Sequence, residues 1–271
     1  MNNQNLKIAV TGALGRMGSL LIKEILKKKN IILSLAIVKN KSSVLHFRKQ
    51  LCIKNKNVNF IICDSLKHQN KKFDILIDFS QPSASMKYLE YCVQHNKHLI
   101  IGTTGFNTIE NETIKLASKK ISIIQSSNFS IGINLIFNLL KDVTSIMSNN
   151  SDIEIIESHH RNKVDAPSGT AIEMGKIISK IMKIELDNNS IYHRVGNVGV
   201  RPNKKIGFSS IRAGNIIGEH TVMFANNDEE VLITHKAINR LSFIKGVIKA
   251  ALWLPSQKNG LFNMKHVLNI Q

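Results

Sequence analysis

The stretch LKIAVTGALGRMG at residues 6–18 decides the fold that this sequence predicts. It starts as an apolar run typical of a buried strand and continues into three glycines spaced Gly-x-x-Gly-x-x-Gly. From Met17 to Leu26, apolar residues recur at helical spacing, and a second apolar run follows at 31–38. Strand, glycine turn, helix and strand in this order predict a β-α-β unit of a parallel sheet.

A glycine-rich turn of this kind brings backbone N–H groups and a helix N-terminus to a pyrophosphate. The turn alone is a weak signal, and its place in a β-α-β unit strengthens it. Leu14 stands where the commoner dinucleotide fingerprint has its second glycine. We predict a dinucleotide site, and the cofactor-binding candidates in the turn are Gly12, Ala13, Leu14, Gly15, Arg16 and Met17.

The end of the second strand bears on the choice of dinucleotide. The usual fingerprint has an acidic residue there, which binds the adenosine ribose, but this chain has Val38 followed by Lys39. Lys39 can pair with a ribose 2′-phosphate, as can Arg16. We therefore hypothesise that NADPH binds at least as well as NADH.

Further apolar strands are expected at 73–80, 97–101 and 121–125, and helices alternate with them. This alternation predicts a doubly wound parallel sheet, in which ligands gather at the carboxyl ends of the strands. Turn formation alone also explains Gly, Ser and Thr at such ends, but four similar ends on one sheet edge favour a cofactor site. The additional cofactor-binding candidates are Lys39, Phe79, Ser80, Gly102, Thr103, Thr104, Ser126, Ser127, Asn128 and Phe129.

Near residue 131 the pattern changes. A long apolar helix is expected at 133–147, and strand-like runs follow at 206–212, 219–224 and 230–235 without helices between them. Consecutive strands of this kind predict a separate α+β domain with a mixed or antiparallel sheet.

The stretch ESHHRNKVDAPSGT at 157–170 joins a predicted strand to a predicted helix. Adjacent histidines suggest proton handling or metal ligation, because histidine titrates near neutral pH. Successive residues of a strand point to opposite faces, so His159 and His160 cannot both aim at one atom, which weakens the metal interpretation. Lys163 can donate a proton or pair with a carboxylate.

The same stretch ends in Pro-Ser-Gly-Thr, a turn into a helix whose first N–H groups attract anions. We predict a pocket for a small carboxylate-bearing substrate with a proton donor beside it. A merely solvated polar loop is the better explanation of a lone histidine, but the full set of residues favours the pocket.

Composition limits the other possibilities. With 271 residues, of which 43% are hydrophobic, the chain can form two domains with sizeable cores. The net charge of +18 comes from scattered basic residues, and we expect no nucleic-acid partner. Three cysteines without a Cys-x-x-Cys pair indicate a reducing, cytoplasmic location. No signal peptide or membrane-spanning run is visible, so no membrane partner is expected.

These motifs together resemble the bacterial 4-hydroxy-tetrahydrodipicolinate reductase family, long called dihydrodipicolinate reductases, of lysine and diaminopimelate biosynthesis. The resemblance covers almost the whole chain. It is carried by the glycine turn, by 101–106 and 128–130, and above all by 157–171, which matches the family's His-His, Lys and Pro-Ser-Gly-Thr-Ala pattern. Val38 departs from the acidic residue that members often have.

The resemblance implies an α/β architecture with a Rossmann-type dinucleotide-binding domain at 1–130 and 240–271. It implies a central α+β domain with a mixed sheet at 131–239, which binds substrate and builds a homotetramer. His159 would be the general acid/base and Lys163 the proton donor, with no metal. The residues expected to hold the substrate are His160, Lys163, Ser168, Gly169, Thr170 and Arg240.

The implied reaction transfers a hydride from NADPH or NADH to a cyclic, dicarboxylate-bearing imine after loss of its hydroxyl as water. Another Rossmann-type dehydrogenase of amino-acid metabolism is an alternative, but it is not expected to carry the motif at 157–170. A non-catalytic dinucleotide-binding protein is a second alternative, which an assay of nicotinamide oxidation would distinguish.

Overall fold

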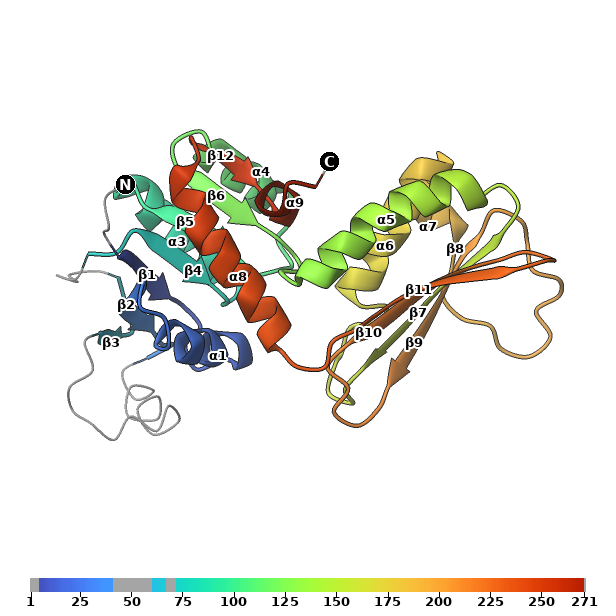
Figure 1. Cartoon of the computed structure of the whole chain (residues 1–271), viewed down its shortest axis with the longest axis horizontal. Coiled ribbons are helices and arrows are strands. Elements are labelled where there is room, and N and C mark those ends of the chain that lie inside the picture. The colour runs from blue at the N-terminus through green and yellow to red at the C-terminus, as the bar shows by residue number, and fades with distance from the viewer. Residues whose placement is uncertain (1–4, 41–59, 67–71, 271) are drawn as a thin grey trace. The chain divides into compact units, whose positions relative to one another are not determined.

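The structure is a computed structural model that describes residues 5–40, 60–66 and 72–270. Its chain divides into two units (Figure 1). The first consists of Met1–Ser130 and Phe243–Asn269, and the second of Ile131–Ser242 with Ile270–Gln271.

The glycine-turn strand lies near the middle of a seven-stranded sheet in the first unit, with the order β12-β6-β5-β4-β1-β2-β3. All its described strand pairs are parallel. The chain moves to one side of β1 for the next two strands and returns to its other side for β4, and ligands bind at such a switch point. This confirms the predicted doubly wound sheet. The strands are β1 (Leu6–Val10), β2 (Ile31–Ile37), β3 (Ile61–Cys63), β4 (Ile75–Asp78), β5 (His98–Ile101), β6 (Ser122–Gln125) and β12 (Gly260–Phe262).

Helices cover both faces of this sheet (Figure 1). Helices α1 (Arg16–Ile25), α8 (Leu241–Trp253) and α9 (Met264–Leu268) pack on one face, and α3 (Pro82–Gln94) and α4 (Thr108–Ala117) on the other. The strands are apolar on both sides because both faces are buried, and each fully buried Leu or Ile stabilises the fold by roughly 1.5–3 kcal/mol. A short 3-10 turn, η1 (Leu254–Ser256), follows α8.

The second unit has a mixed sheet in the order β11-β10-β7-β9-β8. Strand β7 pairs antiparallel with β10 and parallel with β9, which confirms the predicted mixed α+β architecture. Helices α5 (Ile131–Met147) and α6 (Gly169–Met182) pack on one face of the sheet (Figure 1). The remaining elements are β7 (Asp152–His159), α7 (Leu186–Asn189), β8 (Ser190–Ile191), β9 (Ile206–Arg212), β10 (Glu219–Ala225) and β11 (Glu230–Lys236).

Alternation along β7 positions the candidate site. Ile153 and Ile155 are buried under the helices, and Glu157 is the next residue on that face. The strand thus carries a carboxylate to a place where the pattern would otherwise put an apolar side chain, and His159 follows on the same face.

Two simpler expectations concern cysteines and membranes. Cys63 and Cys92 are free and buried, while Cys52 lies outside the described residues. No described helix has both the length and the apolar character needed to span a bilayer.

Candidate active site

The ends of three neighbouring strands in the first unit meet on the fully buried carboxylate of Asp78, the last residue of β4. Thr11, after β1, donates its hydroxyl to this carboxylate, and Ser80 does so at 2.5 Å. Thr103, after β5, donates at 3.0 Å, and its hydroxyl accepts the N–H of Ser80 at 3.0 Å. Ser85 of α3 is the fourth hydroxyl donor. Asp78 therefore ties together the strand ends that were predicted to bind the cofactor.

The glycine turn packs closely against the same edge. Gly12 has φ +60, and a Cβ there would overlap the carbonyl oxygen of Phe79. A Cβ on Gly102 would overlap the Phe79 ring. Helix α1 begins at Arg16, directly after the turn, and the first N–H groups of a helix attract anions. This cradle fits the pyrophosphate of a dinucleotide.

The last strand end is partly a core element. Ser126 donates its hydroxyl to the carbonyl of Asn128 at 2.9 Å, and the Phe129 ring packs edge-on against Phe79 with centroids 6.2 Å apart. Asn128 and Phe129 are buried, whereas Ser127 is exposed. Elsewhere on the edge Ala13 and Thr103 are also buried, and the exposed candidates are Gly15, Arg16, Lys39 and Thr104.

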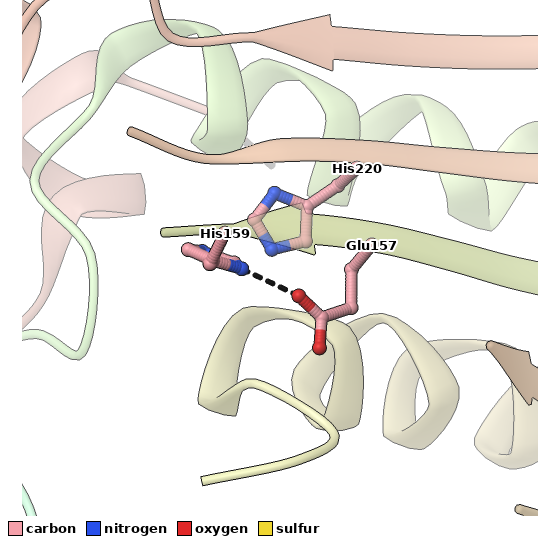
Figure 2. Close-up of side chains that lie close together, drawn as sticks. All are labelled: Glu157, His159 and His220. Carbon is pink, nitrogen blue, oxygen red and sulfur yellow. Dashed lines mark hydrogen bonds and ion pairs between the residues drawn. The ribbon is translucent and has the colours of Figure 1, made fainter. Parts of the chain in front are cut away.

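In the second unit, a buried carboxylate holds the histidine that was predicted to be catalytic (Figure 2). The Glu157 carboxylate accepts a hydrogen bond from Nδ1 of His159. It also accepts two from Arg212, at 2.6 and 2.9 Å, and one from the N–H of Ser168 at 3.2 Å. Burial alone would raise the pKa of Glu157, but hydrogen bonds from His159, Arg212 and Ser210 outweigh it, and the pKa lies well below its ordinary value.

The protonation of His159 follows from this contact. An ionised carboxylate can only accept hydrogen bonds, so Nδ1 of His159 carries the proton that Glu157 binds. The ring is therefore held with Nε2 as the atom left for proton exchange. Nε2 lies beside the backbone of Gly218, where an added Cβ would come within 3.1 Å of it.

A second histidine packs against this pair. His220, on β10, is buried, and its ring centroid lies 5.0 Å from that of His159 (Figure 2). Its Nε2 lies 3.0 Å from Oγ of Ser168, which also accepts the N–H of Ala171 and so caps α6. Burial, and then the charge of His159, lower the pKa of His220 to about 3, so this histidine is neutral near pH 7.

Glu157, His159 and His220 also have the composition of a metal site, with one donor atom from each lying within 4.8 Å of the others. However, the Arg212 guanidinium already provides positive charge at the carboxylate and would repel a cation. Hydrogen bonds already engage the Glu157 carboxylate, Nδ1 of His159 and Nε2 of His220. The arrangement therefore favours proton handling over metal binding.

Lys163 lies in the loop that follows β7. Its ammonium donates to both oxygens of Asp165 at 2.8 Å, which shows that it can hold a carboxylate by two contacts. Burial would raise the pKa of Asp165, but the hydrogen bond and charge of Lys163 outweigh it and lower that pKa. The backbone of the same loop is tied to β9, because Arg212 donates to the Asp165 carbonyl at 2.6 Å.

Comparisons with known proteins identify the family. A model of the dihydrodipicolinate reductase N-terminus matches residues 6–129, and a model of the dihydrodipicolinate reductase C-terminus matches residues 132–268. The chain belongs to the dihydrodipicolinate reductase family. The resemblance expected from the sequence is confirmed.

Individual relatives are similar in sequence to this reductase over almost its whole length. The 4-hydroxy-tetrahydrodipicolinate reductase of Buchnera aphidicola subsp. Baizongia pistaciae is 53% identical over 100% of both chains. That of Buchnera aphidicola subsp. Cinara cedri is 53% identical over 97% of this chain and 96% of its own. A dipicolinate-bound dihydrodipicolinate reductase from Paenisporosarcina sp. TG-14 has a TM-score of 0.77 at 22% identity, covering 99% and 100% of the two chains, which shows a shared fold.

The structure brings some of the predicted catalytic and substrate-binding residues of this reductase together. His159 and Ser168 meet on Glu157, and Lys163 lies in the loop between them. Ser168 is buried with its N–H and hydroxyl both engaged inside the protein, whereas Gly169, the first residue of α6, is exposed. Arg240 lies at the turn before α8, and within the described chain no hydrogen bond joins it to this cluster.

The central residues of the two clusters that had no predicted role are Asp78, Glu157, Arg212 and His220. Glu157 stands in the quoted motif, but its alternation with Ile153 and Ile155 was the signal that could have marked it as a buried partner of His159. Arg212 and His220 lie on other strands, far along the sequence, and no local pattern connects them with the motif.

Proposed function

We propose that this reductase uses NADPH or NADH to reduce 4-hydroxy-tetrahydrodipicolinate to tetrahydrodipicolinate in lysine and diaminopimelate biosynthesis. The full-length similarity to 4-hydroxy-tetrahydrodipicolinate reductases, at 53% identity, carries this proposal. The paired His159 and Glu157, with Lys163 in the next loop, supply the acid–base groups that such a reduction needs.

The first unit would bind the dinucleotide, which supplies the hydride when it is bound. The N–H groups of the glycine turn and the start of α1 would hold its pyrophosphate. Asp78 would keep the ends of β1, β4 and β5 in register beside it, through its bonds to Thr11, Ser80 and Thr103.

The second unit would bind the substrate. His159 acts as general acid/base through Nε2, because Glu157 occupies Nδ1. Lys163 donates a proton and pairs with a carboxylate, in the way that it now holds Asp165. Since Ser168 is engaged by Glu157 and His220, the other carboxylate would meet the first turn of α6 from Gly169 onward, with His160, Thr170 and Arg240 around it. A cyclic dicarboxylate, dipicolinate, is bound in the Paenisporosarcina reductase.

An absorbance assay of reduced-nicotinamide oxidation with freshly made substrate tests the proposal. His159→Gln and Lys163→Ala should each lower kcat by about a hundredfold or more, because each removes a positioned proton-transfer group. The KM for NADPH should not change. His193→Gln and Lys180→Ala, which alter exposed residues of the same unit, are matched controls. Near-wild-type turnover in either His159→Gln or Lys163→Ala would refute that residue's role.

We further propose that the protein is a cytoplasmic homotetramer assembled through the second unit. The sheet face opposite α5 and α6 supports this, because Ile211 and Leu232 on it are 48% and 55% exposed. Exposed apolar side chains on an open sheet face are suited to pairing with another copy. Light scattering of the purified chain should give four times the 30.4 kDa chain mass, and a monomer would refute the assembly.

A further inference from the structure

Arg212, the last residue of β9, uses every terminal N–H of its guanidinium. Nη1 donates to the Glu157 carboxylate at 2.9 Å and to the Ile211 carbonyl at 2.8 Å. Nη2 donates to the other Glu157 oxygen at 2.6 Å and to the Asp165 carbonyl at 2.6 Å. The side chain is 19% exposed, and its carboxylate partner is 1% exposed. Because the guanidinium is planar and rigid, these four hydrogen bonds hold the Arg212 side chain in a single orientation.

Two of the groups that Arg212 binds, the Glu157 carboxylate and the Asp165 carbonyl, each connect it to one of the two predicted catalytic groups. Glu157 holds Nδ1 of His159. Asp165 belongs to the loop that carries Lys163, and its side chain binds the Lys163 ammonium at 2.8 Å. In addition, β9 runs beside β7 so that Arg212 pairs with His159 in the strand register, and the next residue, Ala213, donates its N–H to the His159 carbonyl at 2.9 Å.

We propose that Arg212 is a positioning residue for the reaction, which sets the separation and orientation of His159 and Lys163 by binding Glu157 and the Asp165 carbonyl at once. The inference rests on the proposed function, because it concerns the same acid–base pair. Arg212 itself moves no proton. It fixes one carboxylate that orients the imidazole and one carbonyl that anchors the lysine loop, and a displacement of about 1 Å in either can cost about a hundredfold in rate.

A purely structural role is the competing explanation, and Arg201 provides its matched control. Arg201 belongs to the same unit and is also 19% exposed. It likewise binds carboxylates, those of Asp152 and Glu154, and backbone carbonyls, among them Ile153 at 3.1 Å. None of these partners touches His159 or Lys163 among the described residues, so loss of Arg201 should affect folding without affecting catalysis.

Lysine is the informative substitution at both positions. It keeps the positive charge, but its three donors radiate from a single nitrogen and cannot reach both Glu157 oxygens and the Asp165 carbonyl together. Arg212→Lys should therefore preserve the neutrality of the buried pair while losing the connection between the two catalytic segments. Arg201→Lys makes the same chemical change at the control site.

The first experiment measures kcat, the KM for NADPH and the thermal midpoint of wild type, Arg212→Lys and Arg201→Lys. We expect kcat of Arg212→Lys to fall about ten- to hundredfold with the KM for NADPH unchanged, as misplacement of catalytic groups predicts. Arg201→Lys should keep wild-type kcat even if its midpoint falls as far. Equal kcat in the two variants would overturn the inference. An inactive wild-type chain would instead refute the proposed function.

The second experiment uses chemical rescue, which a folding role would not give. Arg212→Ala leaves a space shaped for a guanidinium, so millimolar guanidinium ion should raise its kcat several-fold, while methylammonium should not. Arg201→Ala, measured alongside, should not respond to either cation. An equal response of the two alanine variants to guanidinium, or none from a folded Arg212→Ala, would overturn the inference.

Discussion

Asp78 and Glu157 are both buried carboxylates at the ends of strands, but the protein holds them by different means. Four neutral hydroxyl groups donate to Asp78, from Thr11, Ser80, Ser85 and Thr103. Glu157 instead binds a guanidinium and an imidazole, together with the Ser210 hydroxyl and one backbone N–H.

The two sets of partners differ in how well they can adapt when the carboxylate is replaced. A hydroxyl can rotate and can either donate or accept, so the partners of Asp78 can re-pair if the central group changes. A guanidinium can only donate, and it carries a charge that burial makes costly to leave without a partner. We therefore expect the carboxylate of the second unit to tolerate far less change than that of the first.

Glu157→Gln should show the largest effect. The amide would place an N–H against one of the Arg212 donors and leave the guanidinium without its counter-charge. Breaking a buried ion pair on one side typically costs about 3–5 kcal/mol of unfolding free energy, and kcat should fall too because His159 loses its charged partner. Urea unfolding and the reductase assay measure these two losses.

Glu154→Gln is the control for that variant. Glu154 lies on the same strand but on the other face, and it pairs with Arg194 and Arg201. Its side chain is 16% exposed, so solvent replaces part of the lost interaction and we expect a loss of about 1 kcal/mol or less. Equal losses of unfolding free energy for the two substitutions would show that burial does not strengthen the ion pair of Glu157.

Acid should destabilise the second unit through His220. Its pKa in the folded protein is about 3, against an ordinary value of 6.5, because burial and the neighbouring His159 disfavour its charged form. Below pH 6.5 the unfolded chain binds a proton that the folded chain does not, so stability falls as the pH falls from about 6.5 toward 3. Between pH 6.5 and pH 5 the loss should be about 2 kcal/mol.

His220→Gln should remove this component, because glutamine does not titrate. Glu157 adds a further loss only at lower pH, since its lowered pKa gives stability that disappears as the pH falls below the ordinary value of 4.5. Far-UV circular dichroism reports both units, whereas fluorescence of Trp253, the one tryptophan, reports the first. A His220→Gln protein with an unchanged slope of stability against pH would contradict the assignment.

The sequence predicted the features that depend on local pattern. The strand at residues 6–11, the glycine turn and the helix after it follow from apolar spacing and from the backbone freedom of Gly12. The mixed sheet followed from consecutive strands without helices. The motif at 157–170, which was predicted to be catalytic, was recognisable because its unusual residues are adjacent.

The partners of that motif could not be found in the same way. The contact of Arg212 with Glu157 depends on the register of β9 against β7, and a shift of one residue would turn Arg212 to the other face. Ser168 shows a different limit. Its side chain caps α6 and contacts His220, and serine before an apolar helix is a common capping signal that the substrate prediction did not take into account.

Asp78→Asn tests whether the hydroxyl groups around Asp78 can adapt to a change of the central side chain. Thr11, Ser80, Ser85 and Thr103 can rotate to accept from the new amide, so we expect a loss of only about 1 kcal/mol in unfolding free energy. The affinity for NADPH should fall a few-fold because the strand ends shift, while kcat at saturation should change little. Calorimetric titration with NADPH measures the affinity, and a loss as large as that of Glu157→Gln would remove the distinction between the two carboxylates.

Lys39→Ala should have the smallest effect. It removes a positive charge that pairs with neither Asp78 nor Glu157. In the second unit the positive charge of Arg212 is paired with Glu157 inside the protein. In the first unit Lys39 and Arg16 are exposed at the sheet edge whose strand ends bind Asp78. Val38 is buried and apolar, so it cannot bind the adenosine ribose hydroxyls. An exposed charge pair contributes about 0.2–1 kcal/mol, so Lys39→Ala should raise the KM for NADPH at most about fivefold and leave that for NADH unchanged.

Lys119→Ala, which removes an exposed charge after α4, is the control for the general effect of net charge on a polyanionic cofactor. If Lys39 binds the ribose phosphate, the ratio of the two KM values changes only in Lys39→Ala. A wild-type protein that clearly prefers NADH, or a ratio that Lys39→Ala does not alter, would contradict the role of Lys39. The specificity would then have to come from the backbone of the edge itself, where exposed cations act only by raising the local concentration of either dinucleotide.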